Sequence, residues 1–451
     1  MKKKDIIELK IEELEFPLKG IGYHEDKKVF VKNAIPGQVV RTYIKKVRKD
    51  HAEGKLLEVI ERSSTEVESF CEHFGNCGGC SYQTIPYEKQ MNMKAELVKG
   101  LLDDAGIKGY KFLGIEGSPE EYAYRNKMEY SFGNEKKGGE LNLGMHKKGK
   151  FHDVVTVDQC KIVDEDFNTI LKTMLDYFRG KGTPLYNNKT HEGYLRHFIV
   201  RKAKKTKEIV INLVTSTQII FDMAELVEIM KNLKLTGELV GFIHTFNDNI
   251  ADTVVNERTE VLWGQDFFTE ELLGLKFKIS AFSFFQTNSL GAEKLYSMVL
   301  DFMGDAENKN VFDLYCGTGT IGQIVAKKAK KVMGIELIEE AVEAANKNAQ
   351  MNGLNNCHFI AGDVLKKIDE LTTKPDIIIL DPPRVGVHPK ALKKVLAYRA
   401  PEIIYVSCNP RSLAENLKDV QKAGYKVKTV KCMDMFPHTP HVEVVVRIEK
   451  K

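Results

Sequence analysis

A cysteine that follows an apolar run is the first candidate for chemistry in this sequence. Residues 405–407 lead into Cys408, and the chain then turns at Asn409 and Pro410. In open α/β sheets, ligands bind at the carboxyl ends of the strands, so a thiol in that place could act as a nucleophile. A cysteine there is more often a small buried apolar residue than a catalyst. The other motifs must decide between these interpretations.

A second group of cysteines lies in the N-terminal half. Cys71, Cys77 and Cys80 fall within ten residues, with two glycines between the last pair. Glycine lets the backbone fold tightly enough for several sulfur atoms to converge. A tetrahedral zinc site or a 4Fe-4S cluster needs a fourth ligand, which we expect to be Cys160. The spacing does not decide between zinc and iron–sulfur.

From residue 310 onward, apolar runs of strand length alternate with helical segments. This order predicts a doubly wound, Rossmann-like parallel sheet. The strands are expected at residues 311–316, 331–336, 357–360, 376–380 and 402–406. Apolar and polar residues alternate from His441 to Ile448, which predicts an edge strand. Within it, Glu443 is either a candidate base or a solvated side chain on the same face as Arg447.

Three features indicate a nucleotide-like cofactor at the carboxyl ends of these strands. Residues 317–322 fit the pattern G-x-G-x-x-G, and Glu336 ends the next strand, where it could accept hydrogen bonds from ribose hydroxyls. Asp381 is followed by two prolines, which stiffen the loop that carries it. Asp363 ends the third strand, where it could meet an adenine amino group. Together these features favour a methyltransferase that uses S-adenosylmethionine over a dehydrogenase.

Short alternating runs between residues 8 and 60, separated by glycines, predict a small barrel of about five strands. The glycine pattern of residues 19–22 and 35–37 resembles the TRAM module, an oligonucleotide-binding-like barrel of RNA-modifying enzymes. The run from Arg41 to Lys49 is rich in cations, which favours a polyanionic partner.

Two segments of the central part, residues 124–130 and 194–201, interleave aromatic and cationic residues on strand-like runs. Such a pattern suits stacking on unpaired bases and pairing with phosphates. It is equally found in ordinary half-exposed strands. The cations that we predict to contact RNA are Arg125, Lys127, Arg196 and Arg201.

The chain has 451 residues, enough for two or three domains, and its net charge of +4 does not by itself predict nucleic acid. The sequence shows no signal peptide and no apolar stretch of membrane-spanning length, so we expect a cytoplasmic protein with no membrane partner. In that compartment thiols stay reduced, and cysteines serve metal binding or catalysis. We expect a monomer, because no protein partner can be inferred.

Five motifs together resemble the RNA uracil-5-methyltransferase family: residues 284–288, 313–319, 381–386, 407–410 and 441–443. The match covers nearly the whole chain, because the barrel and the cysteine triplet resemble the branch that modifies 23S ribosomal RNA. The bacterial transfer-RNA branch typically lacks both. The resemblance thus implies 5-methyluridine formation in 23S ribosomal RNA, with transfer RNA as the alternative substrate.

The resemblance also implies a role for each motif. Cys408 would add to the uracil ring, and Glu443 would remove the proton from carbon 5. Thr320 departs from the asparagine of some members. The ligands of a 4Fe-4S cluster would be Cys71, Cys77, Cys80 and Cys160. The residues around S-adenosylmethionine would be Gln286, Tyr315, Gly317, Gly319, Glu336, Asp363 and Asp381.

The expected domains are a barrel at residues 1–62, a central α+β RNA-binding and iron–sulfur domain at 63–275, and a methyltransferase domain at 276–451. The helix expected at 86–105 could pack on the last of these. A non-catalytic iron–sulfur RNA-binding protein would also explain the cysteines and the basic runs. It gives no reason for a cysteine and a glutamate at strand ends.

Overall fold

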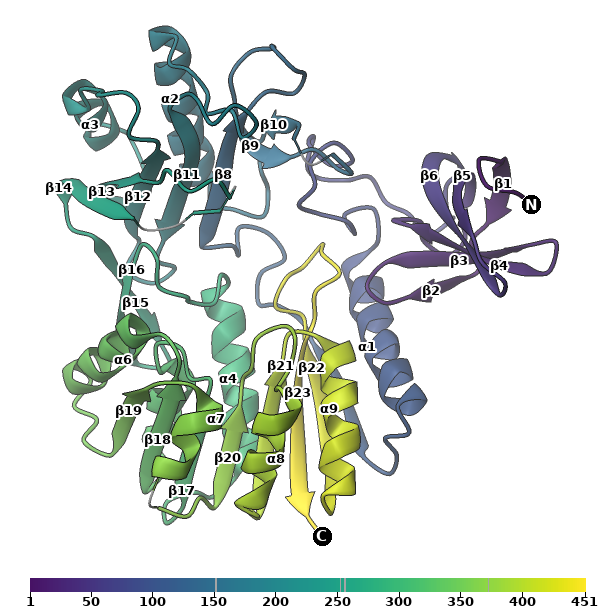
Figure 1. The fold of residues 1–451 in the computed structure, drawn as a ribbon, viewed down its shortest axis with the longest axis vertical. Helices are drawn as coiled ribbons and strands as arrows, with labels where there is room; N and C mark the ends of the chain where they lie inside the picture. The colour runs from purple at the N-terminus through teal and green to yellow at the C-terminus, as the bar shows by residue number, and fades with distance from the viewer. Residues whose placement is uncertain (151, 252, 255–256, 372) are drawn as a thin grey trace.

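The computed structural model describes residues 1–150, 152–251, 253–254, 257–371 and 373–451. Three sheets and one hairpin organise these residues. In Figure 1 the N-terminal barrel lies to one side, the central sheet lies at the top, and the C-terminal sheet with its helices lies at the bottom. The predicted fold class, a β-barrel followed by a mixed unit and a Rossmann-like unit, is confirmed.

The N-terminal sheet has six strands in the order β1-β5-β6-β4-β3-β2. Alternate residues face its interior, where Leu9, Val29 and Ile44 are buried. Gly22 permits a close approach of two strands, because a Cβ there would lie 2.2 Å from the carbonyl oxygen of Lys10. The strands are β1 (Ile6–Lys10), β2 (Glu13–Glu15), β3 (Lys19–His24), β4 (Lys27–Lys32), β5 (Val39–Val47) and β6 (His51–Glu61).

The central sheet has seven strands in the order β10-β9-β8-β11-β12-β13-β14. Two helices pack against it through Phe167, Leu171 and Leu226. Its elements are β8 (Lys127–Gly133), β9 (Asn142–His146), β10 (Val154–Thr156), α2 (Glu165–Lys181), β11 (Leu195–Lys202), β12 (Glu208–Thr215), α3 (Ala224–Lys231), β13 (Glu238–Phe246) and β14 (Arg258–Gly264). The hairpin of β15 (Phe267–Leu272) and β16 (Leu275–Ser280) leads into the C-terminal unit.

The C-terminal sheet has eight strands in the order β19-β18-β17-β20-β21-β23-β22-β7. Successive residues of its strands point to opposite faces, so each face buries its own core. Val311 belongs to the core with helices α4, α5 and α6, and Phe312 to the core with α1, α7, α8 and α9. Its strands are β7 (Lys111–Glu116), β17 (Asn310–Leu314), β18 (Lys331–Glu336), β19 (Cys357–Ala361), β20 (Ile377–Leu380), β21 (Glu402–Ser407), β22 (Tyr425–Met433) and β23 (Glu443–Lys450). Its helices are α1 (Tyr87–Asp104), α4 (Ser289–Met303), α5 (Thr320–Ala326), α6 (Glu339–Met351), α7 (Val364–Lys367), α8 (Pro389–Ala397) and α9 (Pro410–Lys422).

Two features of this sheet differ from the sequence-based expectation. The prediction that residues 441–448 form an edge strand is wrong, because β23 lies between β21 and β22 and pairs with both. The actual edge strand, β7, comes from before the central sheet and pairs in parallel with β22. Residues 87–116 therefore complete the C-terminal sheet, although they fall in the range expected for the central domain.

The barrel contacts the rest of the chain at the cysteine-rich segment and at α9. Leu18 and Ile35 of the barrel share a small core with Tyr82 and Ile85, and the Tyr82 hydroxyl donates a hydrogen bond to the carbonyl oxygen of Pro17 at 2.8 Å. Within the described ranges, no helix is both long enough and apolar enough to cross a membrane.

Candidate active site

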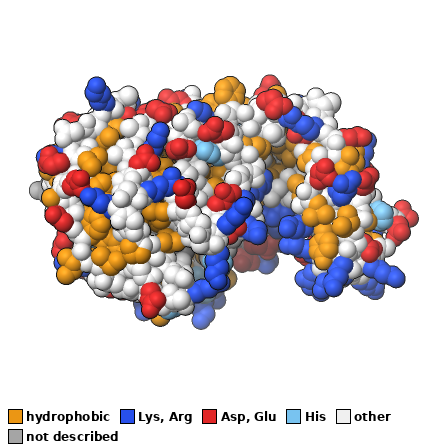
Figure 2. All heavy atoms as spheres, turned by 90° about the horizontal axis from the view of Figure 1, so that it is seen from above, with side chains coloured by type: hydrophobic (Ala, Val, Ile, Leu, Met, Phe, Trp, Pro, Cys, Tyr) orange, Lys and Arg blue, Asp and Glu red, His pale blue; other side chains and the backbone are white. Residues whose placement is uncertain are grey.

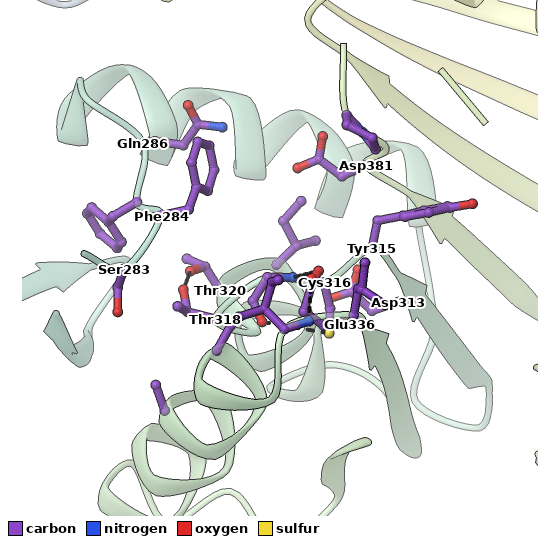
Figure 3. Close-up of a pocket in the computed structure, with 18 of the residues that line it drawn as sticks. Ser283, Phe284, Gln286, Asp313, Tyr315, Cys316, Thr318, Thr320, Glu336 and Asp381 are labelled. Carbon is purple, nitrogen blue, oxygen red and sulfur yellow. Dashed lines mark hydrogen bonds between the residues drawn. The ribbon is translucent and has the colours of Figure 1, made fainter. Parts of the chain in front are cut away.

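A cavity of about 1620 Å³ opens at the carboxyl ends of β17, β18, β20 and β21. Figure 3 shows that side chains from the glycine turn, from the segment before α4 and from the loop after β20 face it. The predicted site residues that line it are Gln286, Tyr315, Gly317, Glu336, Asp363, Asp381, Cys408 and Glu443. Both groups of predicted residues, for the cofactor and for catalysis, thus share one space.

The glycine turn is held by Glu336 at the end of β18. Its carboxylate accepts hydrogen bonds from the backbone N–H of Gly317 at 3.0 Å and of Ile338 at 3.1 Å. Gly319 does not line the cavity but begins α5 with a φ of +69°, and a Cβ there would lie 2.7 Å from the ring of Phe359. Glycine is therefore needed at this position for conformation and for space.

Of the acids that line the cavity, Asp313, Asp381 and Glu443 have strongly raised pKa values, and we call these three the carboxyl cluster. Burial raises the pKa of Asp313 and of Asp381 to about 7, and the pKa of Glu443 to about 8 with a further contribution from Asp381. In the described part of the chain, neither carboxyl oxygen of Asp313 has a hydrogen-bond partner of normal geometry. Buried acids in this state favour a cationic ligand.

Strand register brings Cys408 and Glu443 together. β21 and β23 are antiparallel, and their last pair joins Ser407 to Val444. The next residue on each strand is Cys408 on one side and Glu443 on the other, so the two face each other across the strand ends. Burial raises the pKa of the Cys408 thiol to about 11, and Glu443 and Asp381 add to this rise. The nearby Arg384, which also lines the cavity, opposes it.

Arg411, close to Cys408 in sequence, is directed to the barrel. Its guanidinium pairs with Glu15 at 2.7 Å and donates a hydrogen bond to the carbonyl oxygen of Phe16. The turn before it is fixed by Asn409, which caps α9 and donates to the carbonyl oxygen of Arg384 at 2.8 Å. Arg411 therefore links the catalytic unit to the barrel, and Arg384 is the cation whose charge opposes the rise in the pKa of Cys408.

The four cysteines of the predicted cluster lie near one another, where β9 meets the cysteine-rich segment. Burial raises the pKa of Cys80 to about 12 and of Cys160 to about 11, and the neighbouring thiols add to both rises. The backbone N–H of Gly79 donates to the sulfur of Cys77 at 3.3 Å. The thiols of Cys80 and Cys160 would be ionised only by a strongly cationic centre.

Two of the four predicted RNA contacts prove to be structural. Arg196 and Arg201 are each 3% exposed. Arg196 donates to the carbonyl oxygens of Asn247 and Asn249 at 2.6 and 2.8 Å, and Arg201 donates to that of Ser283 at 2.6 Å. The prediction that they contact RNA is therefore wrong, because a buried guanidinium that donates to carbonyl oxygens inside the fold cannot reach a phosphate.

Arg125 and Lys127 are only partly buried. The Arg125 Nε donates to the carbonyl oxygen of Lys127 at 3.0 Å, and the Lys127 ammonium lies 3.6 Å from Glu129. These two residues stay predictions as RNA contacts.

The cavity also contains residues to which the sequence assigned no individual role, although Phe284 and Asp313 stand in the motifs at 284–288 and 313–319. Phe284 is 70% exposed and Phe436 is half-buried, yet both line it. Asp313 carried a usable signal, since it is a single acid in an otherwise apolar strand. Phe436 carried none, because it reaches the cavity from a loop whose position depends on contacts with distant segments.

The comparisons with known proteins agree with this geometry. A family model described as tRNA (Uracil-5-)-methyltransferase matches residues 86–451, and a TRAM domain model matches residues 2–57. The chain is 56% identical to an uncharacterized RNA methyltransferase of Clostridium tetani, over 100% of this chain and 99% of that protein. It is 55% identical to an uncharacterized RNA methyltransferase of Caldanaerobacter subterraneus, over 100% of both chains.

Among solved structures, the chain resembles the Pyrococcus abyssi tRNA (uracil-54, C5)-methyltransferase in complex with S-adenosyl-L-homocysteine. The TM-score is 0.76 at 25% identity, covering 98% of this chain and 100% of that one. Taken with the cavity, the cysteine opposite a glutamate and the two matching family models, this likeness leads to one conclusion: the chain belongs to the RNA uracil-5-methyltransferase family, with an N-terminal TRAM domain, and uses S-adenosylmethionine.

Proposed function

We propose that the protein methylates carbon 5 of a uridine in 23S ribosomal RNA through a covalent bond between Cys408 and the uracil ring. The observation that carries this proposal is the register that sets Cys408 opposite Glu443 at the rim of the cavity. A non-catalytic RNA-binding protein would have no use for that pair.

The residues of the cavity fit S-adenosylmethionine. Glu336 would accept the ribose hydroxyls, Tyr315 and Asp363 would flank the adenine, and Gln286 and Asp381 would lie towards the reacting end. The carboxyl cluster suits a sulfonium, because buried acids favour a cation. When bound, S-adenosylmethionine supplies an electrophilic methyl group, and the protein must make carbon 5 of uracil a nucleophile.

Cys408 would provide this activation. Carbon 5 of uracil is too weakly nucleophilic to take the methyl group unaided. When the thiolate bonds to carbon 6, the electron pair of the ring double bond moves to carbon 5, which can then attack the methyl group. The Cys408 thiol must first give its proton to water, and the charge of Arg384 favours the resulting thiolate. The uridine has to leave any base stack, at a cost of a few kcal/mol.

Glu443 would complete the reaction. After methylation, carbon 5 holds both the new methyl group and its original proton. Glu443 takes that proton, the double bond re-forms, and the bond from carbon 6 to the Cys408 sulfur breaks. A carboxyl whose pKa is raised to about 8 is a stronger base than an ordinary glutamate, which suits the removal of a proton from carbon.

The RNA would approach through the hollow between barrel and central sheet. Figure 2 shows lysine and arginine side chains gathered beside this hollow. Burial lowers the pKa of Lys148, which follows β9, and the nearby cation Lys32 of the barrel adds to this effect. Cations in proximity from two units form a natural contact for a phosphate chain. Arg125 and Lys127 would extend the same contact.

Cys71, Cys77, Cys80 and Cys160 are proposed to hold a 4Fe-4S cluster. Tetrahedral zinc, with bonds to sulfur of about 2.3 Å, requires sulfur atoms about 3.8 Å apart. Within the described residues, the ligand atoms that gather within 4.8 Å of one another belong to Glu72, His73 and Asp158, and no three cysteine sulfurs do so. The choice of a 4Fe-4S cluster over zinc rests on the family resemblance.

The choice of RNA rests on the family resemblance, and transfer RNA is the second candidate. It is favoured by the Pyrococcus abyssi enzyme, a tRNA methyltransferase whose likeness covers 98% of this chain, so that the barrel region is shared. Methylation assays with 23S ribosomal RNA and with unmodified transfer RNA decide between them. Methylation of transfer RNA alone would refute the ribosomal assignment.

The covalent step is tested with RNA that carries 5-fluorouridine, because fluorine cannot leave as a proton does. We expect a stable protein–RNA adduct that forms only with S-adenosylmethionine and is lost in Cys408→Ala. Cys316→Ala is a matched control, since Cys316 lines the same cavity but follows β17, whereas Cys408 follows β21. An adduct that persists in Cys408→Ala would overturn the assigned nucleophile.

The cluster is tested by iron and sulfide analysis after anaerobic purification. We expect about four of each per chain, with a loss of both in Cys80→Ala. Stoichiometric zinc would refute the iron–sulfur assignment.

A further inference from the structure

The loop from Asp434 to His441 joins β22 to β23 and reaches both the cavity and the cysteine-rich segment. The two ends of the loop are joined at the candidate base. Met433, the last residue of β22, pairs with Glu443, the first residue of β23. Phe436 of the loop lines the cavity. The position of this loop therefore affects where the backbone of Glu443 lies.

Groups from four distant segments hold the backbone of this loop. Asn288 donates to the carbonyl oxygen of Met435 at 2.9 Å, and Tyr124 donates to that of Pro437 at 3.0 Å. The backbone N–H groups of Ser81 and Tyr82 donate to the carbonyl oxygen of His438 at 2.9 and 3.0 Å. Lys94 of α1 donates to that of Phe436 at 3.3 Å. Four successive carbonyl groups are thus fixed from outside the loop.

A buried ion pair fixes the beginning of the loop. The Lys94 ammonium lies 2.7 Å from the Asp434 carboxylate, and the two side chains are 1% and 0% exposed. Removal of one partner from such a pair leaves an uncompensated buried charge. This pair is therefore a poor target for a selective test, because any variant would perturb the whole fold.

Gln90, one turn before Lys94 on α1, joins the loop to the cysteine-rich segment. Its side chain is fully buried. The Oε1 accepts from the backbone N–H of His438 at 2.9 Å, and the Nε2 lies 3.1 Å from the Nδ1 of the same residue. The Nε2 also donates to the carbonyl oxygens of Tyr82 at 3.1 Å and Ile85 at 2.8 Å. One neutral amide thus touches both segments.

We propose that Gln90 is a positioning residue for the second half of the reaction. By tying His438 to the segment that follows Cys80, it keeps the loop in place and holds Glu443 where it can remove the proton from carbon 5. This proposal rests on the proposed function, because it takes Glu443 to be the base. It also gives the cysteine site a mechanical role: the segment that carries Cys80 supports the base through His438.

The test separates the formation of the covalent adduct from its resolution. Adduct formation is measured with 5-fluorouridine RNA, and adduct resolution with normal uridine RNA after rapid mixing with S-adenosylmethionine. In Gln90→Met we expect formation to change less than about threefold. Resolution should slow about a hundredfold, the effect of displacing a catalytic group by about 1 Å. Glu443→Gln should trap the adduct with normal RNA.

Two further variants keep the proposal falsifiable. Leu102→Ala creates a cavity in the same helix about three turns away from Gln90, and we expect it to lower stability without changing the ratio of the two rates. His438→Ala keeps the backbone hydrogen bonds of the loop and should slow resolution about tenfold, a milder displacement than in Gln90→Met. This variant tests the proposal if Gln90→Met fails to fold.

The possible results separate the two assignments. If Glu443→Gln does not trap the adduct, the assigned base is wrong and the proposed function fails at that step. If Glu443→Gln traps it, but Gln90→Met or His438→Ala resolves it at the parental rate, the positioning role alone is refuted. Equal slowing of formation and resolution would also refute it, because that pattern indicates general loosening of the fold.

Discussion

Replacing Glu443 by glutamine should remove a pH-dependent cost that this side chain imposes on the fold. Glu443 is 4% exposed, and burial raises its pKa from about 4.5 to about 8. The folded chain therefore holds this proton more tightly than the unfolded chain does. The resulting stabilisation is complete below about pH 4.5 and is lost progressively as the pH rises through 8.

The size of the effect follows from the two pKa values. One pH unit corresponds to about 1.4 kcal/mol, so the full loss is about 5 kcal/mol, of which about 4 kcal/mol falls between pH 5 and pH 9. Glutamine has nearly the same shape and does not titrate. The free energy of unfolding of the parent, relative to Glu443→Gln, should therefore fall by about 4 kcal/mol over this range.

Hydrogen exchange of the backbone amides in β21 and β23, followed in urea at several pH values, measures this difference for the unit that contains Glu443. The same comparison in an Asp381→Asn background is a control, because Asp381 is the second cause of the raised pKa and the difference should shrink. A difference that stays constant within about 1 kcal/mol from pH 5 to pH 9 would refute the argument that Glu443 is buried as an acid.

Three other perturbations follow from the same geometry. Affinity for S-adenosylmethionine should rise between about pH 6 and pH 9 as the carboxyl cluster ionises, and affinity for S-adenosyl-L-homocysteine, whose sulfur carries no charge, should not; equal pH dependence of the two affinities in calorimetry would contradict this. Gly319→Ala should lower stability by about 1–3 kcal/mol in thermal unfolding and weaken cofactor binding. In Gly317→Ala the new Cβ has no atom within 4 Å, so its loss of stability should come from backbone strain alone. Arg411→Ala should cost at most about 1 kcal/mol and leave adduct formation within about threefold; a large drop would show that this residue activates Cys408.

The C-terminal half was largely predictable because its chemistry follows the strand ends. Alternating strands and helices dictate a parallel sheet, and the glycine turn, Glu336, Asp363 and Asp381 all follow or end parallel strands. The partnership of Cys408 with Glu443 was not predictable from local pattern. It depends on β23 inserting antiparallel between β21 and β22, a long-range pairing that an alternating sequence does not specify.

The central part shows the opposite outcome. All eight residues of β11 are buried, including Arg196 and Arg201. Cations on a strand usually mark an exposed face. Here carbonyl oxygens of distant loops satisfy them, and no local signal in the sequence reveals such partners. In the same way, the loop that carries Phe436 is positioned by residues more than three hundred places earlier in the chain.

The pairing of β7 with β22 has a consequence for synthesis on the ribosome. β7 ends at Glu116, but its partner strand begins only at Tyr425, and the strand between β21 and β22 is made later still. At about 5–20 residues per second, the helix and strand of residues 87–116 wait for tens of seconds before their sheet exists. During that interval the apolar side of α1, with Val98 and Leu102, has β7 beside it but lacks α9 and the later strands of its core. The nascent chain is thus expected to depend on chaperones that shield this early segment, and the catalytic pair can come together only among the last elements to be translated.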